Sequence, residues 1–127
     1  PAATKSLFNI SKEEYEARAA IVEGAYLYKG CAIATSDELD PAMSVVLPMA
    51  ANDLLTINGV DASFVAIAKN GGVNISARSM GALNVQVILE ALGGGGNSTT
   101  AGGQADNISV EEAKARLLEA IDRYFEN

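Results

Sequence analysis

The sequence predicts an α/β domain, a small mixed sheet flanked by helices, in the order α-β-α-β-β-α-loop-α. Two capping boxes, which begin at Ser11 and Ser109, predict helices, because a serine and the glutamate three positions later can satisfy N–H groups of the first turn. The sequence Asn70-Gly71-Gly72 predicts a pair of strands, since these residues tolerate the positive φ of a hairpin turn. A chain of 127 residues is long enough for one core of this kind.

The first helix is expected over residues 12–23, between its capping box and Gly24. Residues 1–10 precede it without a clear pattern and are expected to be a linker or tail, so the domain itself covers residues 11–127. Residues 25–35 are rich in Tyr, Ile and Ala and too few for a further helix after the glycine. We expect a strand there.

A second helix lies within residues 42–57, after a polar turn. Proline lacks an N–H group and is tolerated only in the first turn of a helix. The main part of this helix is therefore expected to begin near Pro48 and to end near Thr56, with a short helical turn before Pro48.

The middle of the chain predicts a hairpin of two strands, residues 63–69 and 73–78. Side chains of a strand alternate between its faces. Asn74 and Ser76 are therefore expected on one face of the return strand, and the apolar residues between them on the other.

The last part of the chain predicts two helices that are separated by a glycine-rich loop. Apolar residues at helical spacing predict a helix over residues 84–92, which four glycines, 93–96, bring to an end. The final helix is expected over about 110–125, with Leu117 on its buried face.

Composition excludes several classes of site. The chain has 16 acidic and 9 basic residues and a net charge of −7, which disfavours a protein that coats long nucleic acid but allows a local basic site. It has no histidine, so histidine-based acid–base catalysis is excluded. The single cysteine, Cys31, lies in an apolar run and is expected in the core.

No metal site is expected in the chain. One cysteine and no histidine leave almost nothing for zinc, and the scattered acids Asp37, Glu38, Asp40 and Asp53 are interpreted as solvated surface residues. The sequence holds no apolar run of membrane-spanning length, and we expect no signal peptide within it. The chain begins with Pro1 rather than methionine, and we expect it to be a fragment of a longer protein.

Two features could bind a ligand. Arg78, between two serines at the end of the return strand, could fork onto two phosphate oxygens, or it could form a surface salt bridge with one of the acids. The segment from Gly93 to Gln104, rich in Gly, Ser, Thr and Asn, could be a flexible linker. It could also be a nest of backbone N–H groups that faces a phosphate. The residues alone leave both pairs of alternatives open.

Several motifs together carry a resemblance to a known family. The sequence Ile75-Ser76-Ala77-Arg78-Ser79, the stretch Asn-Val-Gln-Val-Ile-Leu-Glu-Ala-Leu-Gly-Gly-Gly-Gly that begins at Asn84, and Ala101 and Gln104 closely resemble the DHH-associated C-terminal domain of DHH-family phosphoesterases. The stretch that begins at Asn84 is most similar to the membrane-anchored bacterial cyclic-di-AMP phosphodiesterases, as are residues 50–55, residues 59–65 and the terminal Glu-Glu-Ala-Lys helix. The resemblance extends over about residues 12–126.

The resemblance implies a domain that binds nucleotide and phosphate, within a parent protein that hydrolyses cyclic-di-AMP to pApA. In such enzymes the preceding DHH domain, joined in cis, binds two Mn²⁺ ions that activate water. The fragment itself is then expected to hold no cofactor and to be inactive. The resemblance further implies a cytoplasmic-facing domain without direct membrane contact, a parent anchored in the bacterial plasma membrane, and leaves a homodimer open.

The resemblance also implies which residues bind the substrate. Arg78 would contact phosphate, with Ser76 or Ser79 in support, and the glycine loop would approach the nucleotide closely. The family's glycine run usually ends in a histidine, which is Asn97 here and cannot carry charge, so substrate choice is open. The expected substrate-binding residues are Arg78, Ser76, Ser79, Gly94, Gly95, Gly96, Asn97 and Ser98.

Two other functions fit the same residues. One is an oligoribonuclease- or exonuclease-type domain of the same family, which would share the fold and the site and act on short oligonucleotides. The other is a non-enzymatic module for a small ligand or a partner, with a glycine loop that is only flexible. The phosphodiesterase hypothesis predicts that Arg78 and residues 93–98 face one common pocket.

Overall fold

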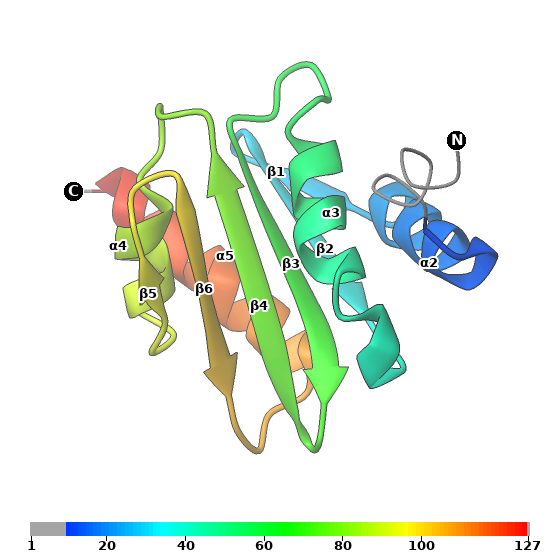
Figure 1. The fold of residues 1–127 in the computed structure, drawn as a ribbon. Helices are drawn as coiled ribbons and strands as arrows, with labels where there is room; N and C mark the ends of the chain where they lie inside the picture. The colour runs from blue at the N-terminus through cyan, green and yellow to red at the C-terminus, as the bar shows by residue number, and fades with distance from the viewer. Residues whose placement is uncertain (1–9, 127) are drawn as a thin grey trace.

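The computed structural model describes residues 10–126, so the predicted linker lies outside the described residues except for Ile10. Six strands form one mixed sheet in the order β1-β2-β3-β4-β6-β5 (Figure 1). The strands are β1 (Tyr26–Tyr28), β2 (Cys31–Ser36), β3 (Ala62–Lys69), β4 (Gly72–Ser79), β5 (Gly95–Gly96) and β6 (Thr100–Ala105). The helices are α2 (Lys12–Glu23), the 3₁₀ helix η1 (Pro41–Met43), α3 (Val46–Leu54), α4 (Val85–Glu90) and α5 (Val110–Glu126). The predicted α/β class, a mixed sheet flanked by helices, is confirmed.

The two faces of the sheet carry separate hydrophobic cores. On one face, α4 and α5 pack against Phe64, Ile75 and their neighbours; on the other, α2 and α3 pack against Val65 and Ile67. Alternation along β3 and β4 explains the division, because successive side chains point to opposite faces. Figure 1 shows that α3 lies over the middle of the sheet and that β6 and β5 have no helix in front of them on this second face.

The capping box at Ser11 begins α2 as predicted. The Glu14 N–H donates to the Ser11 Oγ (3.0 Å), and the Ser11 N–H donates to the Glu14 Oε1 (2.8 Å). These two bonds satisfy backbone donors that the first turn of a helix leaves free. Ile21 is the buried residue of α2.

The single strand that was predicted over residues 25–35 is in fact a hairpin of β1 and β2, so this prediction was wrong. Lys29 and Gly30 form its turn with positive φ angles of 52° and 79°, which is the turn geometry that suits a two-residue hairpin. Lys-Gly is a weaker turn signal than Asn-Gly, which explains why the sequence pattern did not separate the two strands. β2 then pairs in parallel with β3 through the crossover that contains α3.

The second helix begins earlier than predicted. α3 starts at Val46, so Pro48 is its third residue and still lies in the first turn, where no helical N–H bond is lost. The short turn expected before it is η1, which Asp40 caps through a bond from the Ala42 N–H (2.9 Å).

The predicted loop after α4 contains two strands. Residues 95–96 and 100–105 form β5 and β6, and β6 pairs with β4 from Arg78↔Thr100 to Val73↔Ala105. The loop prediction was wrong for these residues because glycine carries no strand propensity of its own. The pairing adds an outer edge to the sheet, directly beside Arg78.

Candidate functional site

Residues of β4, β6 and the β5–β6 hairpin that point to the second sheet face form adjacent rows beside α3, which we term the open strip. Cross-strand partners in an antiparallel pair point to the same face. The registers Asn74↔Gln104, Ser76↔Gly102 and Arg78↔Thr100 therefore put these side chains in three adjacent rows. Gly95 pairs with Gly102 and extends the middle row. The open strip consists of Asn74, Ser76, Arg78, Gly95, Asn97, Thr100, Gly102 and Gln104.

Arg78 supplies a positive charge to the open strip. Its Nη1 donates to the Ser76 Oγ (3.0 Å) and to the Ala77 carbonyl oxygen (2.8 Å). The predicted alternative of a surface salt bridge is not found, because none of the four ion pairs among residues 10–126 includes Arg78. A half-buried guanidinium that is oriented but not neutralised can accept an anion in bidentate geometry.

The two serines beside Arg78 have different surroundings. Ser76, 7% exposed, is in direct contact with the guanidinium. Ser79 lies on the opposite face, where its hydroxyl donates to the Leu83 carbonyl oxygen (2.6 Å) and accepts from the Gly81 N–H (3.0 Å). The Ser79 hydroxyl thus closes the turn into α4, and the geometry leaves Ser76 as the serine that supports Arg78.

The glycine run is ordered by backbone contacts. α4 ends at Glu90, short of the predicted residue 92. Gly93, with φ of 85°, lies in the turn that follows, and the Gly94 N–H donates to the Leu89 carbonyl oxygen (2.8 Å). A Cβ on Gly94 would lie 2.6 Å from the Gly102 carbonyl oxygen, so the close approach of these segments requires glycine. Gly95 has no atom within 4 Å of its Cβ position. The run is therefore a paired strand edge rather than a flexible linker, and the Gly94 N–H is already used within the fold.

The tip of the β5–β6 hairpin is fixed beside Arg78. The Ser79 N–H donates to the Thr99 carbonyl oxygen (3.0 Å), and the Val85 N–H donates to the Ser98 carbonyl oxygen (3.0 Å). The Ser98 side chain is exposed at the tip. These two bonds hold the tip against the end of β4 and the start of α4, so its position relative to Arg78 is defined by backbone contacts.

Asn97 orders this tip from within. Its Oδ1 accepts from the Thr99 N–H (3.0 Å), the Thr99 Oγ1 (3.2 Å) and the Thr100 N–H (2.9 Å). The Asn97 N–H donates to the Thr100 carbonyl oxygen (2.7 Å), which continues the register of β5 and β6 by one pair. With Oδ1 occupied by the turn, the exposed Nδ2 is the group of Asn97 that can donate to a ligand.

The arrangement can bind an anion but holds no group for acid–base catalysis. Arg78, Asn97 and the Thr100 hydroxyl lie in one row at the end of the open strip and offer a charge and hydrogen-bond donors. Across the part of the chain that the structure describes, no three metal-ligating side chains gather. Among residues 10–126, no helix is both long and apolar enough to cross a bilayer.

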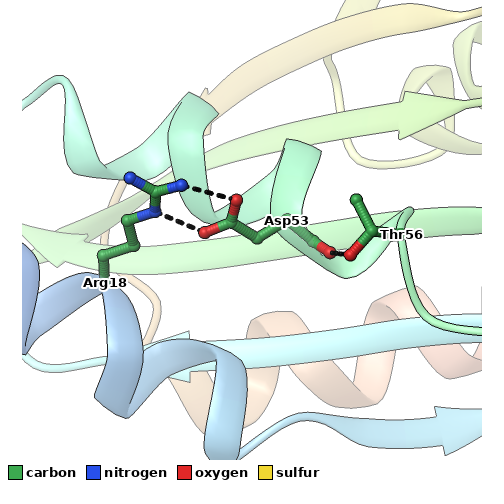
Figure 2. A network of polar contacts seen from close by, with 3 residues as sticks. All are labelled: Arg18, Asp53 and Thr56. Atoms are coloured by element: carbon green, nitrogen blue, oxygen red, sulfur yellow. Dashed lines mark hydrogen bonds and ion pairs between the residues drawn. The ribbon is translucent and has the colours of Figure 1, made fainter. Parts of the chain in front are cut away.

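The other strong polar contacts are structural. Figure 2 shows Arg18 of α2 with its guanidinium forked onto the Asp53 carboxylate of α3, and the Thr56 hydroxyl, which donates to the Asp53 carbonyl oxygen (2.6 Å). The hydrogen bond to Asp53 raises the pKa of the Arg18 guanidinium above its usual value. Asp53 thus joins two helices on the second face of the sheet.

Sequence reasoning missed four members of the open strip, Asn74, Thr100, Gly102 and Gln104; Gly102, like Thr100 and Gln104, lies in β6. Thr100 and Gln104 could not be placed because β6 was not predicted. Asn74 could have been included, since its two-residue spacing from Ser76 and four-residue spacing from Arg78 put all three on one face.

Comparison with known proteins identifies similar chains. The DHHA1 domain family model matches residues 29–127. Cyclic-di-AMP phosphodiesterase GdpP of Geobacillus thermodenitrificans is 45% identical over 124 residues, which are 96% of this chain and 19% of that protein. Cyclic-di-AMP phosphodiesterase PdeA of Listeria monocytogenes is 42% identical over 110 residues, 85% of this chain and 17% of that protein. The chain thus spans about a fifth of the length of these curated relatives.

Solved structures share the fold at low sequence identity. An exopolyphosphatase-related protein of Bacteroides fragilis has a TM-score of 0.80 at 20% identity, over 91% of this chain and 36% of that one. RecJ of Thermus thermophilus in complex with Mn²⁺ has a TM-score of 0.59 at 18% identity, over 87% of this chain and 17% of that one. At these identities the likeness extends to the fold alone.

Proposed function

The chain belongs to the DHHA1 domain family, and from this premise we propose that it is the substrate-binding domain of a cyclic-di-AMP phosphodiesterase. The domain holds a phosphate of the nucleotide at the Arg78 end of the open strip. Two relatives named as cyclic-di-AMP phosphodiesterases, 45% and 42% identical, support this substrate class.

One observation carries the proposal: a half-buried guanidinium that Ser76 orients and no carboxylate among the described residues neutralises. Keeping such a charge without a counter-ion is unfavourable unless solvent or a ligand compensates it. Thr100 and Asn97 lie in the same row and add donors that suit phosphate oxygens. Gly95 and Gly102 beside them carry no side chain, so a nucleotide can approach the backbone of the strip.

The hydrolytic step is assigned to the part of the enzyme outside this chain. Phosphodiester hydrolysis needs an activated water, and the described residues offer neither a histidine nor a metal-ligating cluster. Residues 10–126 therefore do not fit a Mn²⁺ site. We propose that an upstream DHH domain in cis binds Mn²⁺, in keeping with the Mn²⁺ complex of the structurally similar RecJ. Anchoring of the parent in the plasma membrane, with this domain on the cytoplasmic side, is part of the same proposal and rests on the family resemblance.

A second candidate is a domain that binds short oligonucleotides in a related phosphoesterase. The open strip favours it in one respect, since Thr100 and Gln104 at its two ends are both exposed and a longer strand could continue past either end. The net charge of −7 opposes it, because repulsion grows with the number of phosphates. Activity of the full parent on cyclic-di-AMP, pApA and a pentanucleotide separates the two, and preference for the pentanucleotide would refute the cyclic-dinucleotide assignment.

The direct test is an NMR titration of this chain with pApA and with cyclic-di-AMP in the absence of metal. We expect amide shifts at residues 76–79 and 95–100, with an affinity near about 1 mM because only half of the site is present. Arg78→Ala should abolish these shifts. Arg123→Ala is the matched control, since Arg123 pairs with Glu119 on α5, on the other face of the sheet, and should leave the shifts unchanged. Shifts that survive Arg78→Ala would contradict the proposal.

A further inference from the structure

Two carboxamide side chains lie at the end of the open strip that is remote from the guanidinium. Asn74 of β4 and Gln104 of β6 are direct cross-strand partners and point to the same face. Both line one cavity of about 90 Å³, together with Lys69 and Asn70. The side chains of Asn74 and Gln104 form no hydrogen bond with another group in residues 10–126. Every buried side-chain nitrogen or oxygen of the described residues has a hydrogen-bond partner. The unpaired carboxamide atoms of Asn74 and Gln104 are therefore not buried, and a ligand can reach them.

An apolar cavity adjoins the same pair. It has a volume of about 100 Å³ and shares Asn74, Asn70 and Lys69 with the first cavity. Its apolar walls come from the start of η1 and the segment before it, from helix α3 and from the end of β3. The residues concerned are Leu39, Pro41, Leu47 and Ile67, whereas Ala68 turns its side chain to the other face of the sheet. A planar ring with apolar faces and a polar edge could lie between these walls and present its edge to the carboxamides.

The distance between the two ends of the strip suits a nucleotide. Asn74 and Arg78 are four residues apart on one strand, about 13 Å at the rise of an antiparallel strand. Between them lie Ser76, which has a small side chain, and Gly102, which has none, so no side chain projects far from the sheet at this point. An anionic group at Arg78 and a heterocycle at Asn74 can therefore belong to one dinucleotide without a side chain in the way.

Charge fixes the direction of such a ligand. Glu38 and Asp40 line the apolar cavity and Asp106 lines the neighbouring one, against the single cation Lys69. A phosphate is disfavoured at this acidic end and favoured at Arg78. The base is thus expected at the carboxamide end.

We propose that the Asn74–Gln104 pair is a base-reading subsite that recognises adenine in the nucleotide whose phosphate lies at Arg78. A carboxamide presents one donor and one acceptor side by side, which complements the exocyclic amine of adenine and the ring nitrogen beside it. The assignment rests on the proposed function, since the relatives named as cyclic-di-AMP phosphodiesterases supply the choice of adenine. It adds base specificity to phosphate binding in the same strip.

The test compares three ligands that share a phosphate: ribose 5-phosphate, AMP and IMP. IMP keeps the purine ring but has an oxygen in place of the exocyclic amine. In NMR titrations of the chain, AMP should bind about fivefold or more tightly than either of the others. AMP should also shift the side-chain NH₂ signals of Asn74 and Gln104. The double variant Asn74→Ala/Gln104→Ala should bind AMP no more tightly than ribose 5-phosphate.

A second, more conservative variant distinguishes the loss of a contact with the base from a loss of folding. Asn74→Leu keeps about the size of the side chain, removes its donor and acceptor and adds no charge; it should reduce the preference for AMP over IMP while the amide signals of residues remote from Asn74 stay unchanged. Equal affinities for all three ligands, with shifts at residues 76–79, would overturn the base subsite and leave the phosphate site standing. No shift at residues 76–79 with any ligand would overturn the proposed function and the subsite with it.

Discussion

Two adjacent glycines provide a sharp test of the β5–β6 pairing. A methyl group on Gly94 would lie 2.6 Å from the Gly102 carbonyl oxygen and 3.2 Å from the Leu89 Cδ1. The first of these is a backbone atom of β6 and cannot rotate away, so the two segments must separate. Overpacking of this kind costs about 1–3 kcal/mol. At about 4 °C per kcal/mol for a domain of this size, Gly94→Ala should lower the Tm by about 4–12 °C.

Gly95→Ala is the matched control, one residue along. Nothing lies within 4 Å of its Cβ position, and its φ is not in the left-handed region. The substitution should be neutral or stabilise the fold by about 0.4–1 kcal/mol, because it restricts the unfolded chain. Its methyl group would stand in the open strip, so nucleotide binding should weaken while stability does not.

Thermal unfolding and urea denaturation, both followed by circular dichroism, measure the two stabilities, and the NMR titration measures binding. Equal and negligible losses of stability for the two variants would mean that residues 93–96 are not packed against β6. A larger loss for Gly95→Ala than for Gly94→Ala would indicate that the register of the pair is shifted by one residue, which exchanges the two faces.

Three further predictions concern the core and the ionisable groups. Leu117 is fully buried, and Leu117→Ala should lower the free energy of unfolding by about 2–5 kcal/mol in urea titrations; a loss below about 0.5 kcal/mol would refute the packing of α5. Burial raises the pKa of the Cys31 thiol to about 11, so a thiol reagent at about pH 8 should label the native chain far more slowly than the denatured chain. Hydrogen bonds from Lys29 and Tyr28 lower the pKa of the Asp122 carboxyl below 3.8. Its stabilisation is therefore present above that value and lost as the pH falls through the folded pKa. The stability difference between the native chain and Asp122→Asn should stay constant above about pH 5 and shrink as the pH falls below about 4; a difference that does not change at low pH would contradict this.

Elements with local signals could be predicted from the sequence. The capping box of α2 and the Asn70-Gly71 turn between β3 and β4 each depend on residues a few positions apart, and both form as expected. β6 could not be predicted, because its strand character comes from pairing with β4, more than twenty residues away, and from glycines that permit close approach. Propensity describes a residue alone, whereas such a strand is stabilised by its neighbours.

The same distinction holds within the candidate site. Arg78 and Ser76 were identified from the sequence, and the structure brings them into contact. Ser79 was grouped with them because it is adjacent in the chain, yet one step along a strand reverses the direction of the side chain. Strict use of the two-residue period would have selected Asn74 in place of Ser79. Gln104 needed the register of β6, which only the three-dimensional structure supplies.

Asn97 determines how charge is distributed over the open strip. Its Oδ1 accepts three hydrogen bonds that order the hairpin tip, and this tip positions Thr100 beside Arg78. Asparagine therefore keeps the geometry of the corner but adds no charge, unlike the histidine that the family resemblance implies there. With Arg78 as the cation at this end, binding of cyclic-di-AMP, whose phosphodiesters do not titrate in this range, should be independent of pH from about 5.5 to 8. In Asn97→His, binding should tighten below about pH 6.5 as the imidazole becomes charged. A pH dependence already present in the native chain would mean that a group other than Arg78 and Asn97 controls the phosphate site.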